Sequence, residues 1–183
     1  MPGRTVPDAL RAYIGPIQQA VSCFAGVAKI YTSGQVRRVG DFGAWTLNGP
    51  EGMTLRGFGR FWASQRYELV ETSDEHFDVT GERYRVSTRE YLYKVVLDAG
   101  HEIRWHWHPK GNSPERRPHI HPSFDLAAHI PSGRAVLEEV IEGCIEMGAT
   151  PACDDYKDRL LATGGIHKLY RTWADNPTLE ADG

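Results

Sequence analysis

Residues 84–108 read YRVSTREYLYKVVLDAGHEIRWHWH, and their pattern predicts the centre of the fold. Apolar and polar residues alternate on both sides of the turn-forming tripeptide Asp98-Ala99-Gly100, a pattern typical of two strands that pair around a turn. We expect one long or bent strand over Tyr84–Leu97 and a returning strand over His101–His108. The stretch therefore predicts an antiparallel β-hairpin in the middle of the chain.

Apolar residues at helical spacing flank this hairpin near both ends of the chain. They predict helices over residues 7–24, interrupted at Gly15-Pro16; over 132–148, with Ser132 as N-cap; and over about 154–163, ending at Gly164-Gly165. Further strands are expected around residues 27–31, 35–39, 43–48, 66–72 and 119–121. The predicted fold class is α+β, a mostly antiparallel sheet with an N-terminal helix and C-terminal helices.

The composition is that of a globular protein, because 40% of the 183 residues are hydrophobic and 25% are charged. We expect a single α+β domain over residues 1–175 and a disordered tail over 176–183. No apolar run is long enough for a membrane span and the N-terminus lacks a signal-peptide core, so a cytoplasmic location without membrane contact is predicted. The 3 cysteines form no C-x-x-C pair, which argues against a disulfide framework and a cysteine zinc site.

Histidines are concentrated in one part of the chain, with 6 of the 8 lying within residues 101–129. Because successive side chains of a strand point to opposite faces, Trp105 and Trp107 should face the core. Arg104, His106 and His108 should then line up on the opposite face, which we expect to be open to solvent. His119 and His121 share a face in the same way, so a loop that folds back would bring the two His-x-His pairs together.

Such a cluster suits general acid–base chemistry, because the pKa of histidine lies near neutrality and arginine stabilises developing negative charge. The first hypothesis is a metal-independent endoribonuclease that needs no cofactor and takes RNA as its substrate. Its catalytic residues would be Arg104, His106, His108, His119, His121 and His129. Its substrate backbone would be bound by Lys110, Arg116 and Arg117.

Two other interpretations of the histidines stay open. His106, His108, His119 and His121 could bind zinc with an open position for water, as in a zinc-dependent hydrolase. The histidines could instead only cap turns or bond backbone carbonyls. A separate alternative is a non-enzymatic protein-interaction module whose histidine loop and acidic helix face recognise a protein. A helix and a sheet edge near residues 61–97 would also allow a second copy to pair, so a homodimer is a further expectation.

Residues 84–142 resemble the TumE toxin family of bacterial type II toxin–antitoxin modules. The resemblance is carried by Tyr91-Leu-Tyr93, Gly100-His-Glu-Ile-Arg104-Trp105, Pro118-His119-Ile-His121, His129-Ile-Pro-Ser and Leu137-Glu-Glu-Val140. This chain differs at His106-Trp107, where the family usually has Asp-Asn, and in residues 122–128, which look like an insertion. The resemblance implies a small toxin that acts on RNA and is neutralised by a partner antitoxin.

Overall fold

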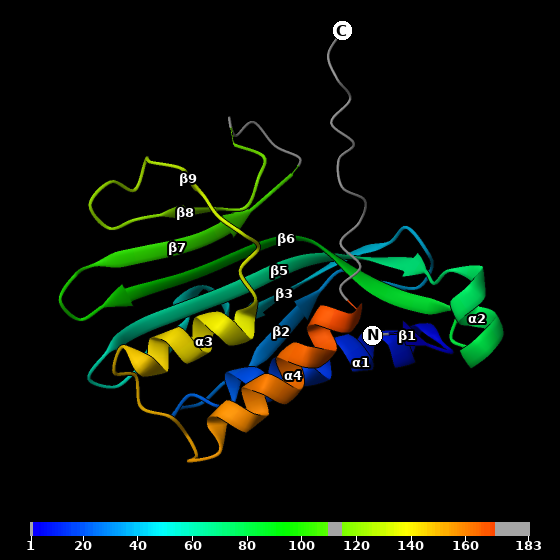
Figure 1. Ribbon diagram of the computed structural model, residues 1–183, viewed down its shortest axis with the longest axis horizontal. Helices are drawn as coiled ribbons and strands as arrows, with labels where there is room; N and C mark the ends of the chain where they lie inside the picture. The colour runs from blue at the N-terminus through cyan, green and yellow to red at the C-terminus, as the bar shows by residue number, and fades with distance from the viewer. Residues whose placement is uncertain (1, 110–114, 171–183) are drawn as a thin grey trace, which may run out of the picture.

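The fold is an antiparallel sheet with helices on one face, as seen in a computed structural model that describes residues 2–109 and 115–170 (Figure 1). The predicted α+β class is confirmed. The strands are β1 (Pro2–Gly3), β2 (Ile30–Ser33), β3 (Phe42–Leu47), β4 (Met53–Leu55), β5 (Gly59–Glu71), β6 (Tyr84–Leu97), β7 (Glu102–Trp107), β8 (His119–His121) and β9 (Ile130–Pro131). The helices are α1 (Val6–Val21), α2 (Asp74–Thr80), α3 (Leu137–Glu146) and α4 (Tyr156–Tyr170), with a 3-10 turn at Gly49–Glu51.

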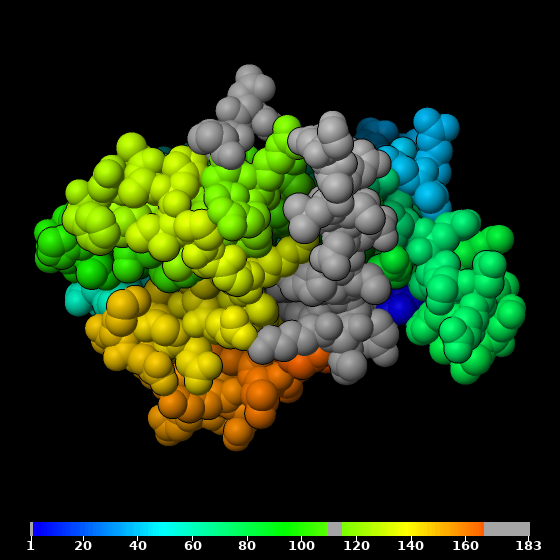
Figure 2. Space-filling model, turned by 45° about the horizontal axis from the view of Figure 1, so that its top comes forward, coloured from blue at the N-terminus to red at the C-terminus, as the bar shows by residue number. Residues whose placement is uncertain are grey.

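The long strands β5 and β6 form the centre of the sheet, whose strand order is β2-β3-β5-β6-β7-β8-β9. β1 pairs with β6 and β4 pairs with β5 outside this order. The predicted hairpin is present, because β6 has the predicted bounds and pairs with β7 from Tyr91↔Trp107 to Val96↔Glu102. Helix α2, which the sequence patterns did not indicate, closes the β5–β6 connection and projects from one end of the molecule (Figure 2).

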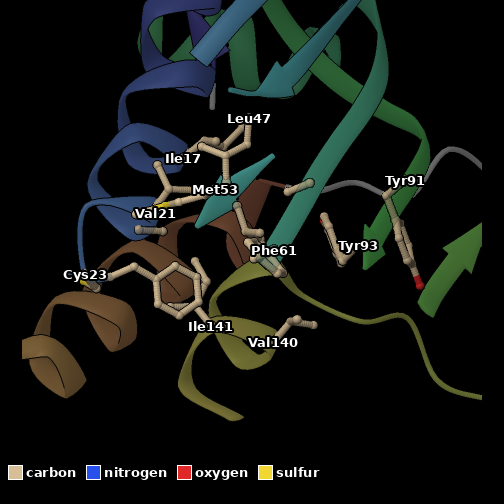
Figure 3. Close-up of a cluster of buried hydrophobic side chains, with 14 of the residues drawn as sticks. Ile17, Val21, Cys23, Leu47, Met53, Phe61, Tyr91, Tyr93, Val140 and Ile141 are labelled. Atoms are coloured by element: carbon tan, nitrogen blue, oxygen red, sulfur yellow. The ribbon is translucent and has the colours of Figure 1, made fainter. Parts of the chain in front are cut away.

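Helices α1, α3 and α4 pack together against one face of the sheet, and no helix of the described residues covers the other face (Figure 1). The core between them contains apolar side chains from α1, α3 and the central strands (Figure 3): Ile17, Val21, Leu47, Phe61, Tyr93 and Ile141. Alternate residues of β5 point into this core, and the residues between them lie on the helix-free face. The two faces of the sheet therefore differ in chemistry, as period-2 patterning requires.

The strands predicted at 27–31 and 66–72 are found at Ile30–Ser33 and Gly59–Glu71, and the three predicted helices also need correction. Helix α1 runs without a break through Pro16, which is buried in its last turns. Helix α3 begins at Leu137 rather than at Ser132, because the Ser132 backbone N–H donates to the Pro118 carbonyl over 2.8 Å and holds that segment extended. Helix α4 continues through Gly164-Gly165, because it packs along α3 there, with Gly164 next to Glu138.

The predicted strand at residues 35–39 is also absent. The Asp41 carboxylate accepts hydrogen bonds from the backbone N–H groups of Arg37 and Arg38, at 2.9 and 3.1 Å, and folds this segment into a turn. The predicted tail at 176–183 lies outside the described residues. Within the described part of the chain, no helix is long and apolar enough to cross a membrane.

Candidate functional site

Five histidines of residues 106–129 meet on the helix-free face of the sheet, where β7 pairs with β8. The register sets Arg104 opposite His121 and His106 opposite His119. On the other face of the same strands, Trp105 and Ile120 line a cavity of about 330 Å³ that they share with α3. The predicted faces of β7 are therefore correct: Trp105 lies on the helix side of the sheet, and Arg104 and His106 lie on the opposite side.

The expectation of an open face holds for β7, where Arg104, His106 and His108 are partly exposed, but the two β8 histidines are covered. His119 is 0% exposed and His121 is 7% exposed. The segment between β8 and β9 folds over them and brings the His129 ring within 4.7 Å of the His119 ring and 4.6 Å of the His121 ring, measured between centroids. Residues 122–128, the apparent insertion, therefore place a further histidine on the cluster.

Two backbone carbonyls set the tautomers of the buried histidines. His119 Nδ1 lies 2.8 Å from the Arg117 carbonyl oxygen, and His121 Nδ1 lies 3.0 Å from the Leu126 carbonyl oxygen. A carbonyl oxygen only accepts, so each Nδ1 carries the proton and each Nε2 keeps its lone pair. His119 Nε2 is buried and has no hydrogen-bond partner among the described residues. Such an arrangement is typical of metal-binding histidines.

A ligand nitrogen from each of His106, His119 and His121 lies within 4.8 Å of the other two. Imidazole nitrogens around a tetrahedral zinc ion, each about 2.0–2.1 Å from the metal, are about 3.4 Å apart. The three rings therefore need only a small inward movement to hold such an ion. His108 flanks them, with its ring centroid 4.2 Å from that of His106 and 5.4 Å from that of His119. The donor set fits zinc, and all three donors are neutral nitrogens.

The environment favours uncharged imidazoles. Burial, together with the neighbouring histidines, lowers the pKa of His106 to about 4. Burial is also the main reason that the pKa values of His108 and His121 are lowered. These rings are therefore neutral at pH 7, the form in which histidine binds a metal or accepts a proton.

The loop over the cluster is held by side chains that the sequence analysis did not single out. Ser123 Oγ accepts from the Glu102 backbone N–H over 3.2 Å and fixes the loop to the start of β7. Asp125 accepts from the backbone N–H groups of Ala127 and Ala128, at 2.9 and 3.2 Å, and forms the turn that aims the Leu126 carbonyl at His121. The Asp125-x-Ala127 turn is a local signal that could have been found in the sequence.

The predicted cationic residues have different surroundings. Arg104 is next to His121 and pairs with Glu102. Arg117 binds the Glu115 carboxylate with two side-chain nitrogens, at 3.0 and 2.8 Å, and so supports its own loop. Arg116 is exposed and Lys110 lies outside the described residues. Of the predicted cations, Arg104 therefore lies beside the histidine cluster, opposite His121. Arg117 is held by its ion pair with Glu115.

Comparisons of this chain with models of known families, with curated proteins and with solved structures found no match. The resemblance to TumE-type toxins rests on the quoted motifs alone and stays a prediction.

Proposed function

We propose that this protein is a metal-dependent hydrolase whose zinc ion is held by His106, His119 and His121. The proposal depends on one observation: three imidazoles converge, and carbonyl hydrogen bonds to Nδ1 leave the Nε2 lone pairs of His119 and His121 available. A buried nitrogen lone pair without a partner is costly, and a bound cation would satisfy it. Of the chemistries predicted from the sequence, zinc binding explains these features best.

Zinc held by three neutral histidines supplies a Lewis acid and lowers the pKa of a bound water. The residues of this chain would contribute the rest of the reaction. His108 is half-buried beside His106 and can accept or donate a proton at the edge of the cluster. The β8–β9 loop excludes water from one side and fixes the orientation of the buried rings.

Metal-independent cleavage of RNA is the second candidate, favoured by the position of Arg104 opposite His121. In that case the same imidazoles would act as acid and base, and the guanidinium would bind the phosphate. A cytoplasmic location, a neutralising antitoxin, an assembly of two copies and an interaction function without catalysis all stay predictions.

Elemental analysis of the purified chain, with RNA cleavage measured with and without EDTA, separates the two candidates. We expect about one zinc per chain, and we expect His119→Ala to lose it. His76→Ala serves as the matched control, because His76 binds Glu82 at 3.0 Å outside the cluster. Metal-free wild-type protein that cuts RNA in EDTA would reject the zinc hypothesis in favour of acid–base cleavage.

A further inference from the structure

We propose that Lys94 and Arg104 form a binding site for the phosphate group of an ester substrate, next to the histidine cluster. Phosphate esters would then be the substrate class of the histidine site, and this part of the proposal rests on the proposed function. Binding of phosphate to Lys94 and Arg104 does not depend on that function and can be measured separately.

The sheet register places the two cations in one row. Trp62 pairs with Lys94, Lys94 pairs with Arg104, and Arg104 pairs with His121. Paired residues share a face, and neighbouring strands are about 4.8 Å apart. The row therefore crosses four strands on the helix-free face, from an aromatic ring through two cations to a residue of the cluster.

The charge on this face is unevenly compensated. Arg66 binds Glu90 at 3.3 Å, and Arg89 binds Glu68 at 2.7 Å, so these cations are neutralised by carboxylates of the same face. Lys94 has no carboxylate partner in the described part of the chain, and its Nζ lies 3.8 Å from the centroid of the Trp62 ring. Arg104 is paired with Glu102, so the uncompensated positive charge of the row is located at Lys94.

Each cation is held in place without losing its capacity to bind an anion. The Trp62 ring attracts the ammonium group by its π-electrons but accepts none of its N–H bonds as a carboxylate would. Glu102 engages Arg104 through Nε, which leaves further N–H donors of the guanidinium. A fixed guanidinium and an ammonium on adjacent strands suit the several oxygens of a phosphate group.

Calorimetric titration of the full chain tests the site, with inorganic phosphate in one arm and a single-stranded RNA pentamer in the other. We expect the double variant Lys94→Gln, Arg104→Gln to bind at least one of these probes tenfold or more weakly than wild type. Loss of phosphate binding would identify a small phosphate ester, and loss of pentamer binding alone would identify a nucleic acid strand. Arg66→Gln is the matched control, on the same face but paired with Glu90, and it should change binding less than twofold.

Unchanged binding of both probes in the double variant, or no binding to wild type, would overturn the phosphate site. Zinc content and a thermal melt of each variant show whether the fold and the metal centre are intact. Wild-type protein that binds phosphate but no zinc would refute the metal-dependent function and leave the phosphate site standing.

Discussion

At the scale of single residues, the decisive property is the protonation state of the imidazoles. His119 and His121 have their Nδ1 protons fixed by carbonyl oxygens, and His106 is half-buried among other rings. A cluster of this kind is stable only while its members are neutral or share a cation, because adjacent positive charges repel each other in a buried site.

The stability of the metal-free protein should fall as the pH is lowered from about 6.5 toward 4. The pKa of His106 is about 4 in the folded state against 6.5 for an ordinary histidine in the unfolded chain, so the unfolded chain binds the proton first in this window. Urea unfolding in EDTA at pH 7 and pH 5 measures the difference. His106→Gln should reduce the pH dependence, because it removes the imidazole whose pKa is lowered. Equal slopes in wild type and His106→Gln would contradict this explanation.

At the scale of elements, local signals determine where α1 begins. Thr5 Oγ1 accepts from the Asp8 backbone N–H at 3.3 Å, and the Asp8 carboxylate accepts from the Thr5 N–H at 3.2 Å. This reciprocal pair is a capping box, and it lies in the sequence immediately before the apolar positions of the helix.

Thr5→Ala should lower the free energy of unfolding by about 1 kcal/mol, because it removes the cap from the first turn of α1. Chemical denaturation gives the value. Thr5→Ser keeps the accepting oxygen and should recover most of the loss; a serine variant as unstable as the alanine variant would show that the cap is not responsible.

Replacing either of two glycines with alanine should change the stability of the fold, in opposite directions at the two positions. Gly59 at the start of β5 has φ +152°, and a Cβ there would lie 2.1 Å from the Val96 carbonyl oxygen, so Gly59→Ala should destabilise by about 3 kcal/mol or more. Gly143 lies inside α3, and a Cβ there would have no described atom outside its own helix within 4 Å, so Gly143→Ala should stabilise by about 0.5–1 kcal/mol. Thermal melts of both variants test the pair, and a shift of the same sign in both would refute the argument.

At the scale of the whole molecule, the histidine cluster joins segments that are separate in the sequence. β7 provides His106, β8 provides His119 and His121, and the following loop provides His129. A ligand that binds these groups together binds the folded state and not the unfolded chain.

Zinc should therefore stabilise the whole fold. At a free zinc concentration one hundred times the Kd, the gain is about 2.7 kcal/mol, and the Tm should rise by several degrees. Scanning calorimetry with zinc and with EDTA measures the shift, and His119→Ala should abolish it. An identical Tm under both conditions in wild type would contradict a zinc site.

Much of the fold follows from local patterns, and the errors share one physical cause. The alternation along residues 84–108 predicts the hairpin and the correct faces of β7, because period 2 depends on the backbone alone. The predicted start of α3 is wrong because a long-range hydrogen bond between Ser132 and Pro118 outweighs the local cap signal. The predicted end of α4 is wrong because packing on α3 tolerates glycines that would otherwise end a helix.

The chemical composition of the site can be read from the amino-acid sequence: histidines at alternating positions of two strands, beside an arginine. The tertiary structure alone decided that His119 and His121 are buried, that carbonyls orient their rings, and that Lys94 and Trp62 extend the row from Arg104. Side-chain alternation is a property of neighbouring residues along one strand. Burial, ring orientation and cross-strand rows depend on register and on which loop covers the sheet, and these are set by contacts between distant parts of the chain.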